Sequence, residues 1–281
     1  MALTKADAAR TVQTRDWKLR YYEAGSGHPV ILLHGSGPGA TGWSNFSGNI
    51  ESLAEHFHVY AVDMPGWGDS DACTVDRLDH VDAAIQFMDA LGIDRAAFVG
   101  NSMGGQTSLR LAVQHPDRIS HLVTMGPPVT MAPKLFGPGD GPSEGLKVLI
   151  QAYLDASPEN MRRLVEIMVY DKARFATPEL CAARSEAALA RPDHLANYVA
   201  GLPHGAPVPT WVRPEDLPGI KAPSLFVHGR DDRVVSFEHS LALVANVPDS
   251  RLVLLNRCGH WAMIEHAEEF NRLVIDFVRN T

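Results

Sequence analysis

The chain has 281 residues, of which 45% are hydrophobic, 21% charged and 7% aromatic, and its formal net charge is −8. These proportions are ordinary for a globular protein, exclude disordered, collagen-like and coiled-coil chains, and leave room for one large domain or a core with an insertion. The acidic balance offers no basic surface to phosphates, so we expect no nucleic-acid partner.

Short apolar strands alternate with helices along the first 125 residues. In chain order, strands are predicted over 17–23, 30–33, 58–63, 96–99 and 119–125, with helices near 50–56, 79–91 and 103–114. Strands that alternate with helices in this way form parallel βαβ units. The pattern therefore predicts an α/β fold, with a mostly parallel central sheet and helices on both faces.

The strand pattern stops after residue 125 and resumes only near residue 224. Between them the chain is rich in Pro, Gly, Met, Arg and Ala, with predicted helices near 145–154, 160–170 and 178–190. Beyond them come predicted strands at 224–228 and 251–255 and helices at 237–244 and 267–279. We interpret residues 128–208 as a helical lid inserted in one core domain, formed by residues 1–127 and 209–281.

The apolar side chains of this predicted lid are expected to form mainly its own core, with a minority lining a pocket. They are Met131, Leu135, Phe136, Leu149, Met161, Met168 and Phe175.

The cysteines and the terminal sequence indicate a reducing compartment. Cys73, Cys181 and Cys258 are odd in number and widely spaced, which argues against a disulfide framework and a zinc site. Residues 1–15 lack the apolar core of a signal peptide, and no stretch approaches the roughly 18 apolar residues of a membrane span. We therefore expect a cytoplasmic protein with no membrane partner and no metal.

The strongest local motif is G-x-S-x-G, formed by residues 100–104 between a predicted strand and a predicted helix. The turn between such elements is sharp, and glycine on both sides of Ser102 removes side chains that would collide there. Ser102 is then expected at the N-terminus of the helix, whose dipole favours developing negative charge. A glycine-rich loop with an unreactive serine is the alternative.

A serine nucleophile needs a histidine base, and the base needs an acid to orient it. His260 follows a predicted strand near the end of the chain, where enzymes with this motif place the base after the acid; a surface histidine is the alternative. Asp231 and Asp232 both follow an earlier strand, and the loop spacing favours Asp232. Asp63 and Asp69 are interpreted as residues that structure loops.

The oxyanion formed by attack on a carbonyl needs two preorganised donors. The N–H of Met103 directly follows the nucleophile, and a second donor is expected from Ser36 or Gly37 in the loop after the second strand. A phosphate-binding loop is the alternative here, but the segment has neither the G-K-[ST] ending nor the G-x-G-x-x-G spacing. His34, at the start of this loop, is interpreted as its support.

Four longer strings carry a family resemblance. They are LLHGSGPGATGWSNF at 32–46, GNSMGG at 100–105, GRDDRVV at 229–235 and CGHWAMIEHAEEFNRL at 258–273. Together they resemble the meta-cleavage product hydrolases, serine-type α/β-hydrolases of bacterial aromatic degradation that cleave a carbon–carbon bond in 2-hydroxy-6-oxo-hexa-2,4-dienoates. The resemblance covers nearly the whole chain and implies the α/β-hydrolase fold with a helical lid.

The resemblance also implies roles for individual residues. A catalytic triad is implied at Ser102, Asp232 and His260, and oxyanion donors at Ser36 and Met103. Contacts with the dienoate are implied at Gly37, Asn45, Asn101, Arg184 and Trp261.

Arg184 is implied as the clamp of the substrate carboxylate, with Trp261 packed beside it. A planar guanidinium pairs with a carboxylate through two hydrogen bonds, but a solvated helix charge is the alternative, because other arginines lie in the same predicted lid. They are Arg162, Arg163, Arg174 and Arg191.

The implied reaction begins with ketonisation of the bound dienol and attack at the C6 carbonyl. It releases 2-hydroxypenta-2,4-dienoate and a carboxylic acid, without a cofactor. We expect a small-molecule dienoate as partner and a homo-oligomer, and the sequence leaves the C6 substituent open. A carboxylesterase or lactonase of the same fold is the main alternative, and a ligand-binding receptor without turnover is another.

Overall fold

The computed structural model describes residues 3–129, 142–202 and 212–281. Within these residues, eight strands form one sheet in the order β1-β2-β4-β3-β5-β6-β7-β8. Their bounds are Ala9–Gln13 (β1), Lys18–Gly25 (β2), Pro29–Leu33 (β3), His58–Val62 (β4), Ala96–Asn101 (β5), Ile119–Met125 (β6), Ser224–Gly229 (β7) and Ser250–Leu255 (β8). The pairs β1–β2 and β2–β4 are antiparallel, and all others are parallel.

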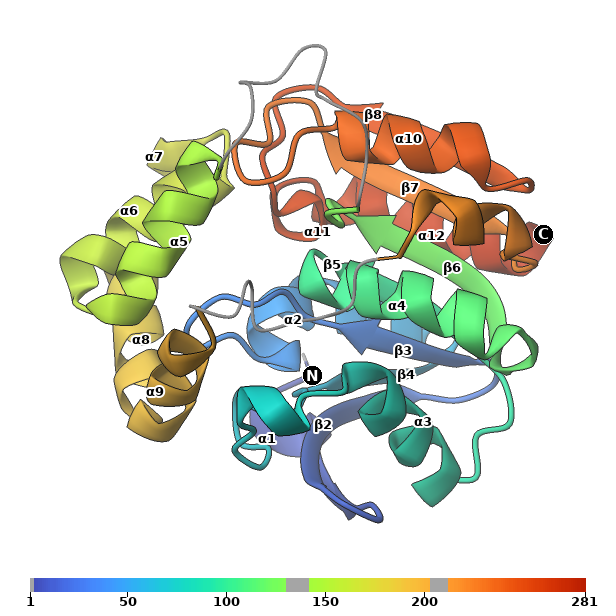
Figure 1. Cartoon of the computed structure of the whole chain (residues 1–281), viewed down its shortest axis with the longest axis horizontal. Coiled ribbons are helices and arrows are strands. Elements are labelled where there is room, and N and C mark those ends of the chain that lie inside the picture. Colours follow the sequence, from blue (N-terminus) through green and yellow to red (C-terminus); the bar gives the residue numbers. More distant parts are fainter. Residues whose placement is uncertain (1–2, 130–141, 203–211) are drawn as a thin grey trace.

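Helices cover both faces of the sheet, as predicted (Figure 1). One face carries α3 (His80–Ala90), α4 (Met103–Gln114) and α10 (Glu238–Asn246), and the other α2 (Gly42–Ala54), α11 (Ala262–Glu265) and α12 (Ala267–Asn280). Because both faces are covered, the central strands are largely buried, and every residue of β5 and β7 is buried. A short helix, α1 (Lys5–Ala8), precedes the sheet.

Several elements differ from the sequence prediction. Helix α2 begins at Gly42 rather than near residue 50, because Thr41 and Ser44 form a reciprocal capping box at its start. Strand β1 pairs with β2, although no strand was predicted there. The helix at Pro192–Gly201 (α9) was not expected either. Predicted strand 119–125 and helix 103–114 agree with β6 and α4 in every residue.

Five α-helices lie between β6 and β7 in the part of the chain that the structure describes. They are α5 (Glu144–Leu154), α6 (Pro158–Met168), α7 (Lys172–Phe175), α8 (Pro178–Leu189) and α9 (Pro192–Gly201). They stand together at one side of the sheet, facing the carboxyl ends of the parallel strands (Figure 1). Met131, Leu135 and Phe136 lie outside the described residues, as does the predicted boundary at residue 208.

The register brings the carboxyl ends of the parallel strands together. Leu33, the last residue of β3, lies opposite Val62 of β4 and Gly100 of β5. In open α/β sheets the loops that leave this edge build the site.

No helix among the described residues is long and apolar enough to cross a membrane. The three cysteines are buried and free.

Candidate active site

Ser102 occupies a strained turn between β5 and α4. Its φ and ψ angles are 51° and −112°, in a region that residues other than glycine rarely adopt. A side chain at Gly100 would collide with the backbone of Gly104, and one at Gly104 with the carbonyl of Leu33. The two glycines of the motif are therefore required by close packing, as the sequence indicated.

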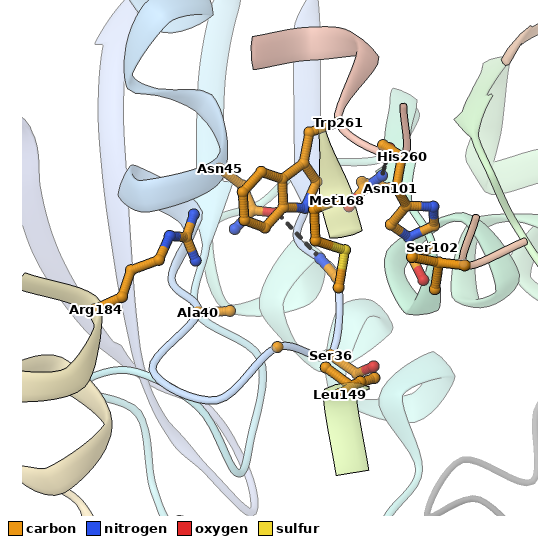
Figure 2. Close-up of a pocket in the computed structure, with 13 residues that line it drawn as sticks. Ser36, Ala40, Asn45, Asn101, Ser102, Leu149, Met168, Arg184, His260 and Trp261 are labelled. Carbon is orange, nitrogen blue, oxygen red and sulfur yellow. Dashed lines mark hydrogen bonds between the residues drawn. The ribbon is translucent and has the colours of Figure 1, made fainter. Parts of the chain in front are cut away.

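His260 and Asp232 form a buried pair next to Ser102. Nδ1 of His260 lies 2.6 Å from Oδ2 of Asp232, and both side chains are almost fully buried. Figure 2 shows the imidazole beside Ser102. Because Nδ1 donates to the carboxylate, Nε2 is the nitrogen left to take a proton from the serine hydroxyl.

The structure distinguishes the two candidate acids. Asp231 is partly exposed and lies 3.6 Å from Arg230, whereas Asp232 contacts His260. Burial by itself would raise the pKa of Asp232, but the charge of His260 and hydrogen bonds from His228 and His260 outweigh burial and lower this pKa. The Asp232 side chain is therefore ionised at neutral pH, as an acid that orients an imidazole must be.

Hydrogen bonds to the carbonyl oxygens of Ser36 and Gly37 fix the loop that follows β3. Tyr153 of α5 donates from its hydroxyl to the carbonyl of Ser36, and the indole N–H of Trp67 donates to the carbonyl of Gly37 at 3.2 Å. These bonds use none of the loop's N–H groups. Ser36 and Gly37 line the same pocket as Ser102, and Met103 begins the helix whose N-terminus faces it.

His34 and Asp63 support loops, as the sequence indicated. Nδ1 of His34 donates to the carbonyl of Gly35 at 2.8 Å, and Nε2 accepts from the N–H of Met64 at 3.0 Å. Burial lowers the pKa of His34 to about 4, so the ring is neutral. Asp63 accepts from the N–H of Gly42 at 2.7 Å.

Arg184 of α8 lines the pocket with a buried guanidinium. Only 5% of the residue is exposed, and its guanidinium carbon lies 4.3 Å from the centre of the Trp261 ring. Burial lowers its pKa to about 10. No carboxylate pairs with it among the described residues, and its Nε has no hydrogen-bond partner there. A buried cation in this state is a ready site for an anion.

The pocket has a polar and an apolar part. Figure 2 shows Arg184 at one side, and Ser102 with His260 at the other. Asn45 and Asn101 also line it, and Oδ1 of Asn101 is buried without a partner in the described structure. Thus every predicted side chain of the substrate site lies at one pocket.

The apolar lining comes largely from outside the core sheet. Leu149 of α5, Met168 of α6 and Val234 of the loop after β7 contribute it. Leu149 and Met168 belong to the minority of predicted lid residues that line the pocket, whereas Met161 is fully buried within the helices. A lining of this kind suits a small organic ligand with one charged end.

Sequence reasoning missed three residues of the site. His228 contacts Asp232, and a histidine inside a buried strand four residues before the acid was a usable signal. Trp67 and Tyr153 hold the loop at Ser36 and Gly37, and no local pattern marks them. Among the described residues no cluster of three or more His, Cys, Asp or Glu side chains has the arrangement of a metal site.

Known proteins resemble this chain over most of its length. Residues 30–273 match the model of the alpha/beta hydrolase family. A 2-hydroxy-6-oxo-6-phenylhexa-2,4-dienoate hydrolase of Comamonas testosteroni is 42% identical over 94% of this chain and 92% of its own. A 2-hydroxy-6-oxononadienedioate/2-hydroxy-6-oxononatrienedioate hydrolase of Burkholderia vietnamiensis is 43% identical over 93% and 91%. The meta-cleavage product hydrolase CumD of Pseudomonas fluorescens superposes with a TM-score of 0.86 at 32% identity, covering 96% of this chain and 97% of CumD.

Proposed function

The chain belongs to the alpha/beta hydrolase family and, within it, to the meta-cleavage product hydrolases, and we propose that it hydrolyses a carbon–carbon bond in 2-hydroxy-6-oxo-hexa-2,4-dienoates. Ser102, Asp232 and His260 act as its catalytic triad. The observation that carries the proposal is the buried guanidinium of Arg184 in the same pocket as this triad. An esterase needs the triad, but it has no use for an unpaired buried cation.

We propose an orientation for the substrate that the geometry supports. The dienoate carboxylate pairs with Arg184, which Trp261 supports, and the C6 carbonyl lies at Ser102. The N–H groups of Ser36 and Met103 then stabilise the oxyanion, because fixed donors need no reorganisation as charge develops.

The reaction needs an electron sink before the carbon–carbon bond can break. Ketonisation of the bound dienol supplies one, and the polar groups at Asn45 and Asn101 lie where the enol oxygen and its neighbours would bind. Oγ of Ser102 attacks C6 while Nε2 of His260 takes its proton. The C5–C6 bond breaks, and its electron pair moves through the conjugated system to the oxygen on C2. That oxygen takes up the proton held by His260, which gives 2-hydroxypenta-2,4-dienoate. Water then hydrolyses the acyl-serine to a carboxylic acid.

The apolar lining favours an uncharged acyl group at C6. Leu149, Met168 and Val234 provide no partner for a second carboxylate, and among the described residues that line this part there is no cation besides Arg184. Burying an unpaired carboxylate there would be costly. We therefore propose an alkyl or aryl substituent rather than the second carboxylate of a nonadienedioate.

Residues 128–208 are proposed to act as the lid of this site. Support comes from two contacts: the carbonyl of Met168 accepts from the N–H of His260 at 2.7 Å, and Tyr153 donates to Ser36. Closure of such a segment excludes water from the reacting groups.

A cytoplasmic location and a homo-oligomeric state are part of the proposal. Cell fractionation checks the location, and light scattering checks the assembly.

Turnover of purified ring-fission products tests the proposal. The panel contains a 6-phenyl dienoate, a 6-alkyl dienoate and a nonadienedioate, followed by loss of the yellow dienolate absorbance, with a p-nitrophenyl ester as neutral comparison. We expect turnover of the first two, weak turnover of the third, and none by Ser102→Ala, which still binds the dienoate. Ester hydrolysis without dienoate turnover would make the protein an esterase, and binding without any turnover would make it a receptor.

A further inference from the structure

We infer that His228 is a positioning residue that holds the carboxylate of Asp232 in the orientation His260 requires. This inference deepens the proposed function and rests on its triad. His228 is the penultimate residue of β7, and its side chain is fully buried. It does not line the substrate pocket, so any effect it has on the reaction passes through Asp232.

The contacts of His228 determine which ring nitrogen carries hydrogen. Nε2 lies 3.2 Å from Oδ2 of Asp232 and 3.0 Å from the carbonyl oxygen of Val235. Both neighbours are acceptors, so Nε2 must be a donor. Nδ1 lies 2.6 Å from Oγ of Ser240 on α10. In the neutral ring Nδ1 is an acceptor, and the Ser240 hydroxyl donates to it.

The donor from His228 reaches the oxygen that matters for catalysis. Oδ2 of Asp232 is also the acceptor of His260 Nδ1, whereas Oδ1 accepts from the N–H groups of Val234 and Val235 at 2.7 and 2.9 Å. The two N–H donors belong to the same loop as Asp232 and move with it. His228 instead lies on strand β7 of the central sheet. Its hydrogen bond therefore fixes Asp232, a loop residue, relative to the sheet that also positions Ser102.

Packing above the pair leaves little room for another arrangement. A Cβ at Gly126, whose φ is +52°, would lie 3.0 Å from Nδ1 of His260 and 3.1 Å from Oδ2 of Asp232. Without the hydrogen bond from His228, the Asp232 carboxylate would have little space in which to take up another orientation. Its negative charge would also be less neutralised and would act more strongly on His260. The titratable groups that act on Asp232 from neighbouring elements are His228, His260 and the buried thiol of Cys258.

The test compares His228→Leu, which removes the donor, with His228→Gln, which places an amide N–H at a similar reach. We expect His228→Leu to lower kcat roughly tenfold to a hundredfold, as for the loss of a hydrogen bond to a charged group, with KM unchanged. The acid limb of its kcat/KM profile should move to higher pH, because a less neutralised carboxylate favours protonated His260. His228→Gln should recover most of kcat and the original limb.

Ser240→Ala is the second variant and keeps the inference testable where His228→Leu does not fold. It should shift the same limb in the same direction by a smaller amount. Thermal unfolding of each variant controls for folding. A wild-type pH profile in both His228→Leu and Ser240→Ala, or a loss of kcat that glutamine does not recover, would overturn the inference.

The pH profiles are measured on both the dienoate and the p-nitrophenyl ester, so that a failure of the proposed function can be distinguished from a failure of the His228 inference. If the wild type hydrolyses only the p-nitrophenyl ester, the proposed carbon–carbon bond hydrolysis fails. The ester pH profiles of the His228 variants then still decide whether His228 positions the triad acid, because the ester needs the same triad.

Discussion

Truncation of Arg184 to alanine tests whether the pocket is built for a carboxylate. The guanidinium is buried, stacks on Trp261 and has no carboxylate partner among the described residues. Loss of one partner of a buried charge pair typically costs about 2 to 5 kcal/mol. Arg184→Ala should therefore lower kcat/KM for the dienoate by about thirtyfold to a few thousandfold, since each 1.4 kcal/mol is a factor of ten.

The effect should be selective for substrates that carry the carboxylate. Steady-state kinetics on the dienoate and on a p-nitrophenyl ester measure it, and the ester rate should change little. Arg184→Lys should recover only part of the loss, because a point charge cannot form both parallel hydrogen bonds. Arg184→Met keeps most of the side-chain volume without the charge and should behave like alanine.

Arg163→Ala is the matched control. This arginine lies on α6 of the same inserted segment, but it is exposed and pairs with Glu159 at 2.7 Å, a type of surface pair that contributes little. Its removal should leave both activities unchanged. Equal losses on dienoate and ester in Arg184→Ala, or full activity in Arg184→Met, would refute the carboxylate clamp and return Arg184 to a packing role.

Three further predictions follow from the contacts of single side chains. Asp232→Asn should lower kcat on any substrate by several orders of magnitude, since the imidazole loses its orientation, while Asp231→Asn should not; the opposite ranking in a kinetic assay would move the acid. Tyr153→Phe removes the hydroxyl that fixes the loop at Ser36 and should lower kcat about tenfold. Equal kcat values for the variant and the wild type would disprove this role of the hydroxyl. Burial raises the pKa of Asp63 from 3.8 to about 7, so the folded state holds a proton that the unfolded state has lost, and stability should fall as pH rises from about 4 to 7. Urea unfolding of Asp63→Asn should lack this fall, which amounts to at most about 4 kcal/mol; parallel curves for variant and wild type would contradict it.

The local pattern predicted most of the elements and the strained turn at Ser102. Helix α4 and strand β6 were predicted residue by residue, because an apolar period and a neighbouring glycine act within a few residues of chain. The strained turn at Ser102 could be inferred for the same reason, since only glycine at both flanking positions permits it. Helix α2 began earlier than its apolar pattern because a capping box, not periodicity, determines its start.

Tertiary structure alone decided which distant groups meet. Sequence spacing favoured Asp232 without excluding Asp231, and the pairing of β7 with β8 is what brings Asp232 to His260. The sequence was also consistent with Arg184 as a solvated charge. In the structure, α8 buries Arg184 against Trp261, which lies 77 residues further along the chain. Side-chain contacts between elements so far apart depend on the packing of whole layers, which no local period encodes.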